Sequence, residues 1–202
     1  ILPELSQRTA RSKVLLQAMP ERDLPWALRR RKIREDKPFA VMCGSLNAVR
    51  RLCAVSDTEA ALLTGMERPI VLLAKKEDYA LAPSIAPGNP CLGVMLPYTP
   101  IHHLLLEDDD VWVMTSGNTS DEPIAYEDAD ALERLSSIAD YFLVHDRPIY
   151  RRVDDSVARV VFGKPYILRR SRGYVPSPLS FNLEAPPVLA VGGELKNTFC
   201  LT

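Results

Sequence analysis

The sequence predicts an α/β fold, in which strands alternate with helices along the chain. Apolar runs of four to six residues at 69–74, 92–96 and 111–114 are typical of strands that are covered on both faces. Segments with an apolar stripe at helical spacing lie between or after these runs, as at 45–52 and 127–138. A chain of 202 residues can bury a substantial core and is most simply one domain with extra material at its ends.

Two further elements are predicted near the start of the chain. Residues 1–25 are hard to interpret and show only a weak helical stripe around Val14, Leu15 and Ala18. From Trp26 the pattern is clearer, because the cation-rich residues 27–31 suit the C-terminal end of a helix. Residues 39–42 then predict a strand.

The later elements follow in order. Serine caps predict helices over 45–52, capped by Ser45, and 58–63, capped by Ser56. Residues rich in proline, with one glycine, predict a loop over 83–90, and Pro100 predicts a helix over 101–106. The remaining elements are a strand at 141–144, a hairpin of 153–162 with 165–168, and a strand at 188–191 that we expect to open a further domain.

Composition narrows the class of protein. The chain has 25 Lys and Arg against 26 Asp and Glu, so a general affinity for nucleic acid or anionic membranes is not implied, and any anion site must be local. The four cysteines, Cys43, Cys53, Cys91 and Cys200, form no C-x-x-C pair, which argues against zinc. No apolar run reaches membrane length and no signal peptide is visible, so we expect a soluble cytoplasmic chain.

The strand at 111–114 runs into a polar turn, Thr115-Ser116-Gly117-Asn118-Thr119-Ser120. In open α/β sheets ligands bind beyond the strand ends, and a glycine between short polar residues lets backbone N–H groups approach an anion. Ser116 and Asn118 are therefore candidate binding residues. The alternative is an ordinary turn that these two side chains merely cap.

A second candidate site is the basic stretch from Lys32 to Lys37. In an extended backbone Lys32 and Arg34 would point the same way, and two cations on one face suit a polyphosphate. Lys37 belongs to the same stretch. The alternative is a solvated basic helix end.

A third candidate combines the segments 147–156 and 168–173. Three guanidinium groups lie within 169–172, and such density needs an anion or an acidic partner nearby. Asp154 and Asp155 could be that partner, so an internal Arg–Asp network is the competing account for Arg169 and Arg172. Arg152 lies in the same stretch, and His145 opens the loop before it as a candidate substrate contact.

The sequence shows no covalent catalyst. It has no G-x-S-x-G, Walker A or H-E-x-x-H pattern, and His102-His103 fits packing or capping better than metal binding. Cations and hydrogen-bond donors without a nucleophile suit nucleotidyl transfer, usually with Mg²⁺, where positioning and charge neutralisation supply most of the catalysis.

From about Leu28 to Thr202 the chain resembles the YrdC-like domain of HypF-type hydrogenase maturation carbamoyltransferases. The matching stretches are RRRKIREDKPFAVM, RPIVLL, LGVMLPYTPIHHLLL, VMTSGNTSDEPIA, ADYFLVHDRPIYRRVDDSVARVV, ILRRSRGYVP and VLAVGGELKNTFCLT. The resemblance places the YrdC-like domain at 26–178. It also makes 179–202 a linker and the opening strand of a following carbamoyl-transfer domain, and leaves 1–25 uninterpreted.

The resemblance implies a twisted mixed α/β sheet with flanking helices and a concave basic cleft. It implies an enzyme that uses ATP, with Mg²⁺, and carbamoyl phosphate to form carbamoyl-adenylate. The carbamoyl group would then pass to the C-terminal cysteine of a HypE-like partner and become a cyanide ligand of the [NiFe] centre. The acylphosphatase and zinc-finger parts of the family have no counterpart here, so we expect a fragment without zinc whose partners include the rest of HypF.

Two family motifs give residue roles. K-x-R would be Lys32 and Arg34, which neutralise phosphates, and S-x-N would be Ser116 and Asn118, which hold the carbamoyl or α-phosphate end. We further expect Arg169 and Arg172 to close the opposite wall.

Asp154 and Asp155 would orient those two arginines or help to hold Mg²⁺. Two other functions remain open: a threonylcarbamoyl-adenylate synthase of tRNA modification, and a non-catalytic nucleotide- or double-stranded-RNA-binding module, which the balanced charge disfavours.

Overall fold

The computed structural model describes residues 14–16, 24–78, 80–120, 122–180, 186–192 and 199–201. These residues form two compact units. The first unit contains the described residues up to Lys37 together with the segment Ser116–Arg152. The second unit contains the segment Pro38–Thr115 and the described residues from Val153 onward.

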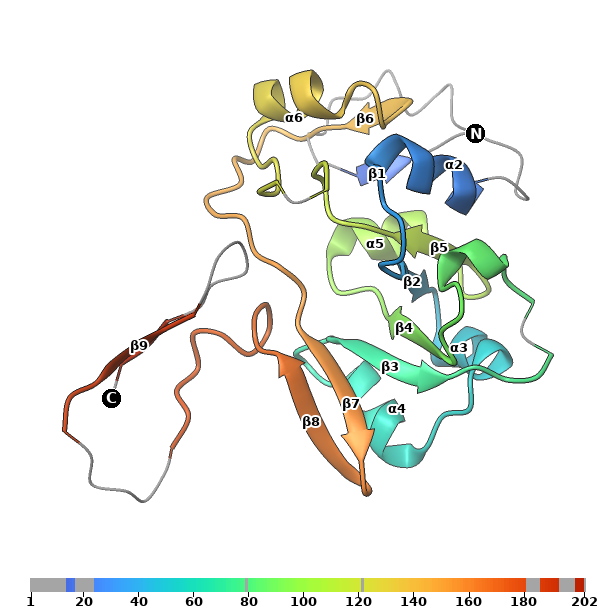
Figure 1. The fold of residues 1–202 in the computed structure, drawn as a ribbon, viewed down its shortest axis with the longest axis vertical. Coiled ribbons are helices and arrows are strands. Elements are labelled where there is room, and N and C mark those ends of the chain that lie inside the picture. The colour runs from blue at the N-terminus through green and yellow to red at the C-terminus, as the bar shows by residue number, and fades with distance from the viewer. Residues whose placement is uncertain are drawn as a thin grey trace. The chain divides into compact units, whose positions relative to one another are not determined.

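A six-stranded mixed sheet forms the centre of the second unit, with the order β5-β2-β4-β3-β7-β8 (Figure 1). Its strands are β2 (Ala40–Cys43), β3 (Ile70–Ala74), β4 (Cys91–Met95), β5 (Val111–Met114), β7 (Val157–Val161) and β8 (Lys164–Arg169). Strand β2 pairs in parallel with β4, and β3 pairs in parallel with β7, whereas the other neighbours are antiparallel. The predicted mixed α/β fold is therefore confirmed.

The core of the second unit lies on the central strands. Val41, Met42, Val71, Leu73 and Val94 are all fully buried. Each buried aliphatic side chain contributes about 1.5–3 kcal/mol to folding relative to an exposed one. The apolar runs that predicted these strands therefore supply the packing that holds the sheet together.

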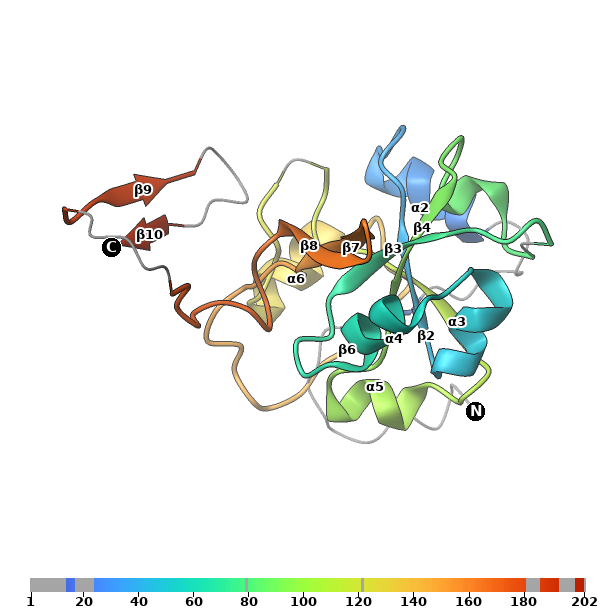
Figure 2. The same ribbon diagram turned by 90° about the horizontal axis from the view of Figure 1, so that it is seen from below.

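Helices α3 (Leu46–Leu52) and α4 (Asp57–Thr64) lie side by side on one face of this sheet (Figure 2). Both start at the predicted serine caps. Ser45 Oγ accepts a hydrogen bond from the backbone N–H of Ala48, and Ser56 forms a reciprocal capping box with Glu59. The short helices η1 (Pro83–Ile85) and α5 (Pro100–Leu105) complete this unit.

The predicted hairpin is also present, as β7 and β8. Its two-residue turn places Phe162 at φ 49° and Gly163 at φ 74°. Positive φ at both positions is the type I′ geometry, whose twist matches that of the flanking strands.

The first unit contains α2 (Leu24–Lys32), α6 (Asp128–Leu135) and an antiparallel pair of β1 (Val14–Leu16) with β6 (Tyr141–Leu143) (Figure 1). Arg31 of α2 donates to the carbonyl of Ile138 at 2.9 Å and pairs with Asp140. This guanidinium therefore ties α2 to the segment that follows α6.

One expectation for the N-terminal segment was wrong. Val14 and Leu15, read as part of a helical stripe, belong to strand β1, because pairing with β6 decides the structure of so short a segment. The helix end expected over residues 27–31 is confirmed, since α2 spans Leu24–Lys32, with Pro25 in its first turn, where a missing N–H is tolerated. Ala18, the third residue of that stripe, lies outside the described residues, as do 1–13.

Strands β9 (Leu189–Val191) and β10 (Phe199–Leu201) form a separate antiparallel pair, which confirms the strand expected near 188–191. Its role as the opening of a further domain remains a prediction, as do the predicted domain boundaries. All four cysteines are free thiols. Within the described ranges, no helix combines the length and apolar character needed to cross a membrane.

Candidate functional site

In the first unit, the side chain of Lys32 reaches the polar turn that follows β5. Its Nζ donates to the backbone carbonyls of Ser116 and Asn118, each at 2.6 Å, and lies 3.4 Å from Asn118 Oδ1. The side chain belongs to the last residue of α2 and is only 3% exposed. Burial, reinforced by the charge of Arg34, lowers the pKa of Lys32 to about 8.

A second contact between these segments runs in the opposite direction. Ser120 Oγ lies 2.7 Å from the carbonyl of Lys32 and 3.1 Å from that of Ile33. Lys32 therefore holds the turn at its beginning, and the turn holds the end of α2 through Ser120. We call these two contacts the Lys32–Ser120 clasp.

The S-x-N side chains are bonded within the turn itself. Ser116 Oγ donates to Asn118 Oδ1 at 2.6 Å, and Asn118 Nδ2 donates to the carbonyl of Glu122 at 2.7 Å. The backbone N–H of Ala125 donates to the carbonyl of Gly117, which closes the loop. The capping role considered for Ser116 and Asn118 is thus present in the structure.

The K-x-R stretch is not extended. Lys32 ends a helix, and Ile33 has a φ of 51°, a left-handed conformation that β-branched residues rarely adopt. The extended backbone under which Lys32 and Arg34 would point the same way is therefore not present, and Lys32 lies at the helix end considered as the alternative. Arg34 Nε instead donates to the carbonyl of Lys37 at 2.8 Å.

Arg29, which the sequence analysis did not single out, shapes this stretch. Its guanidinium is nearly buried and donates to the carbonyls of Arg34, Glu35 and Lys37. Burial lowers the pKa of Arg29, and burial together with the charge of Arg29 lowers the pKa of Arg34. The cluster therefore carries several desolvated positive charges, an arrangement that favours a bound anion.

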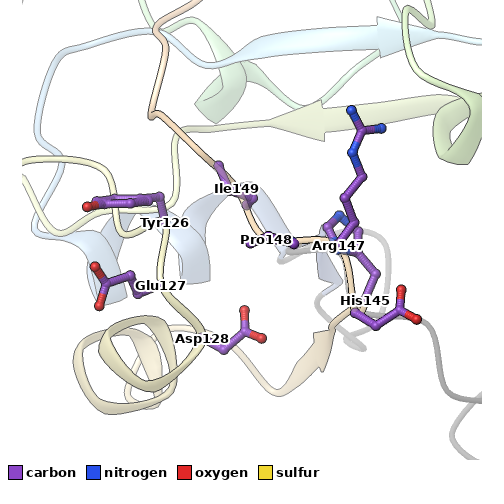
Figure 3. Close-up of a pocket in the computed structure, with 8 residues that line it drawn as sticks. Tyr126, Glu127, Asp128, His145, Arg147, Pro148 and Ile149 are labelled. Carbon is purple, nitrogen blue, oxygen red and sulfur yellow. The ribbon is translucent and has the colours of Figure 1, made fainter.

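A cavity of about 250 Å³ lies further along the first unit (Figure 3). Its lining residues are Tyr126, Glu127, Asp128, His145, Asp146, Arg147, Pro148 and Ile149. His145 Nδ1 is buried and has no hydrogen-bond partner among the described residues. Arg152, on the same segment, lies 6.0 Å from the Tyr126 ring.

The second unit holds the other predicted residues in an internal network. Arg172 Nε pairs with Asp155 Oδ1 at 2.8 Å, and its guanidinium lies 3.5 Å from the ring of Tyr98. Arg172 also donates to the carbonyls of Glu67 and Arg68. The Arg–Asp network considered as an alternative is therefore present for Arg172.

The neighbours of this network were partly missed. Ser156 is fully buried, and its Oγ donates to the carbonyl of Arg172 and accepts from the N–H of Ser171. Burial and the nearby Asp155 raise the pKa of Tyr98 to about 12. Tyr98 lies in the stretch PYTP and Ser156 in the stretch DDS, both of which are rich in turn-forming or polar residues. Neither stretch indicates that these side chains would lie close to Arg172.

The predicted residues thus form two groups. The first unit contains Lys32, Arg34, Lys37, Ser116, Asn118, His145 and Arg152. The second contains Asp154, Asp155, Arg169 and Arg172, where Arg169 Nη1 lies 3.5 Å from the carbonyl of Asp155 and the backbone N–H of Arg172 donates to the carbonyl of Asp154. That both groups line a single pocket remains a prediction.

Comparison with known families identifies the fold. The Sua5/YciO/YrdC family model, described as "Telomere recombination", matches residues 18–171. The chain belongs to this family. The resemblance predicted from K-x-R, S-x-N and the longer stretches is confirmed, since the chain is also similar to proteins named HypF.

A carbamoyltransferase HypF of Synechocystis sp. is 51% identical to this chain over 176 residues, which is 86% of this chain and 23% of that protein. A crystal structure of full-length HypF in a phosphate- and nucleotide-bound form is 48% identical with a TM-score of 0.84, covering 94% of this chain and 30% of the other. The chain therefore spans about a quarter of the length of these relatives.

A more distant likeness concerns the fold alone. The structure of P. abyssi Sua5 complexed with L-threonine is 19% identical with a TM-score of 0.65, over 80% of this chain and 48% of the other. The shared family fold is therefore wider than the HypF group.

Proposed function

We propose that this chain is the adenylate-forming part of a HypF-type carbamoyltransferase. The observation that carries the proposal is the 51% identity to a carbamoyltransferase HypF across most of the chain. The Sua5 relatives share the fold at only 17–19% identity, so the HypF group is the better guide to the acyl group that is activated.

Hydrolysis of carbamoyl phosphate by water releases inorganic phosphate and carbamate, and the reaction would join this carbamate to ATP. A carbamate oxygen attacks the α-phosphorus, the bond from the α-phosphorus to the bridging oxygen breaks, and pyrophosphate leaves with the electron pair. Carbamoyl-adenylate remains. Charge neutralisation and alignment of the two anions would supply most of the rate enhancement, because no covalent bond to the protein forms.

The site in the first unit suits the phosphate end of this reaction. Its buried cationic cluster, which includes Lys32 and Arg34, provides a positive potential beside the 116–120 turn. The Ser116 hydroxyl and the Asn118 amide would exchange their mutual hydrogen bond for bonds to the carbamoyl or α-phosphate oxygens.

The cavity at His145 offers a place for the small acyl unit. Its buried Nδ1 has no hydrogen-bond partner among the described residues, and a carbamoyl group has both an N–H donor and a carbonyl acceptor to satisfy it.

Arg172 in the second unit is bonded to Asp155 and to the carbonyls of Glu67 and Arg68, so its part in the proposal is to hold the local structure of that unit rather than to contact a ligand.

Mg²⁺ normally accompanies ATP, and it prefers carboxylate and other oxygen ligands. In the described part of the chain no three His, Cys, Asp or Glu side chains are grouped closely enough to hold a metal ion, and Asp155 is engaged with Arg172. The residues therefore do not fit a metal site built by the protein alone.

The later steps belong to the proposal as well. The carbamoyl group would pass to a HypE-like acceptor protein. This transfer would need the regions of HypF relatives that this chain does not match, and it would take place in the cytoplasm.

The test is to incubate the 202-residue chain with ATP and to analyse the products by mass spectrometry. We expect carbamoyl-adenylate with carbamoyl phosphate or carbamate, and no adenylate with threonine plus bicarbonate. Threonylcarbamoyl-adenylate in the second arm would overturn the proposal. Chain boiled before incubation is the control for chemical adenylate formation.

A further inference from the structure

The Lys32–Ser120 clasp gives Lys32 a role that differs from contact with phosphate. The ammonium already bonds to two main-chain carbonyls at 2.6 Å, and it is almost completely buried. A charged donor shared between two carbonyls at such distances is a strong hydrogen-bonding arrangement. Moving it to a ligand would leave both carbonyls without this partner.

The carbonyls themselves explain why the clasp matters for an anion. The oxygens of Ser116 and Asn118 carry partial negative charge, which would repel a phosphate or carbamate beside the turn. The Lys32 ammonium covers these oxygens and adds a full positive charge behind them. It can therefore favour a bound anion without touching it.

Ser120 is the second half of this arrangement. Its hydroxyl lies within hydrogen-bond distance of the carbonyls of Lys32 and Ile33, the last turn of α2 and the residue after it. Ile33 has a left-handed φ of 51°, a strained conformation that persists only when the surroundings hold it. Ser120 supplies part of that hold.

We propose that Lys32 and Ser120 are positioning residues, which together fix the Ser116–Asn118 turn in its anion-binding conformation before any ligand arrives. The proposal deepens the function proposed above, because the turn is the site where that function places the adenylate. It assigns Ser120 a part in the site and changes the part of Lys32 from direct ligand to support.

Amide hydrogen exchange of the ligand-free chain is the first test. Lys32→Met should reduce protection in the peptide covering 116–120 by about ten-fold or more, the effect of losing hydrogen bonds to a charged group. Ser120→Ala should also reduce protection of the 116–120 peptide, by a smaller factor. It keeps the experiment informative if Lys32→Met is poorly folded. Protection of α6, which belongs to the same unit as the turn, reports whether each variant keeps its fold.

Arg30→Met is the matched control. Arg30 lies in the same turn of α2, is exposed, and has its guanidinium 5.1 Å from the Trp26 ring. It should leave exchange at 116–120 unchanged. Unchanged exchange in Lys32→Met, together with loss of ATP binding, would make Lys32 a direct ligand residue and overturn the proposal.

The pH profile of ATP affinity separates positioning by charge from simple packing. The pKa of Lys32 is about 8, so affinity should fall between about pH 7 and pH 9 as the ammonium loses its proton. Lys32→Arg should restore much of the protection and give a flat profile, because a guanidinium stays charged over that range. A profile in Lys32→Arg as steep as that of the unmodified chain would contradict the proposal.

The two proposals can fail separately. If the unmodified chain binds no ATP while Lys32→Met and Ser120→Ala still loosen the turn, the positioning role stands and the proposed function fails. If the chain binds ATP and neither variant alters the free turn, the function stands and the positioning role fails.

Discussion

Arg172 is the side chain whose replacement tests the network of the second unit most sharply. Its guanidinium pairs with Asp155, donates to the carbonyls of Glu67 and Arg68, and lies 3.5 Å from the Tyr98 ring. Its side chain is 21% exposed. Arg172→Lys keeps the charge and removes the planar fork that makes these contacts at once.

The expected loss follows from the contacts that lysine cannot keep. An ammonium could still pair with Asp155, but it would lose the two hydrogen bonds to the carbonyls of Glu67 and Arg68. At about 1.5 kcal/mol for each hydrogen bond to a charged group, the free energy of unfolding should fall by about 3 kcal/mol. Loss of the contact with Tyr98 acts in the same direction.

Urea denaturation measures this change. We expect a lower midpoint with an unchanged slope, because the surface exposed on unfolding hardly changes. Arg159→Lys is the control, since Arg159 is an exposed residue of β7, and it should shift the free energy by less than about 0.5 kcal/mol. A loss in Arg172→Lys below about 1 kcal/mol would refute the view that these contacts hold the network together.

Two further predictions concern local structure and thiol chemistry. Ser56→Ala removes the capping box with Glu59 and should lower the free energy of unfolding by about 1 kcal/mol in the same urea assay; no change would show that the box contributes nothing. Burial raises the pKa of Cys43 to about 12 and of Cys53 to about 11, so in the folded chain a thiol reagent at mildly alkaline pH should modify the exposed Cys200 and spare these two. Because these two pKa values are raised in the folded chain, the free energy of unfolding should decline as the pH rises above about 8.5, the thiol pKa in the unfolded chain. Rapid labelling of all three thiols would contradict the burial that raises the pKa of Cys43 and Cys53.

Local signals predicted much of the fold. The continuous apolar runs at β3, β4 and β5 mark strands, of which β4 is buried along nearly its whole length, and the caps at Ser45 and Ser56 act on neighbouring residues. Such features depend on a few consecutive residues, so the sequence displays them directly.

The failures share a different cause. Strand β1 forms because β6, more than a hundred residues later, pairs with it, and three residues cannot reveal a period. The conformation of the K-x-R stretch was left open, because the contacts of Arg29 and Ser120 that hold it come from outside the motif. Neither partner lies in the motif itself.

Three of the candidate residues lie together, although the sequence did not show how they make contact. Lys32, Ser116 and Asn118 do meet, although 84 residues separate Lys32 from Ser116. The sequence could not show that the contact uses backbone carbonyls, because any residue type carries one. For the same reason the residue types at Glu67 and Arg68 did not indicate that their backbone carbonyls bind Arg172.

The account depends most on the claim that the clasped turn binds nucleotide. Calorimetric titration of ATP into the unmodified chain, Ser116→Ala and Ser136→Ala tests this directly, since Ser136 Oγ bonds only locally, to the carbonyl of Glu133, at an exposed position. We predict binding to the unmodified chain and to Ser136→Ala with equal affinity, and about ten-fold weaker binding to Ser116→Ala, the effect of one lost charge-assisted hydrogen bond. Equal affinity in all three proteins, or no binding to the unmodified chain, would contradict the claim.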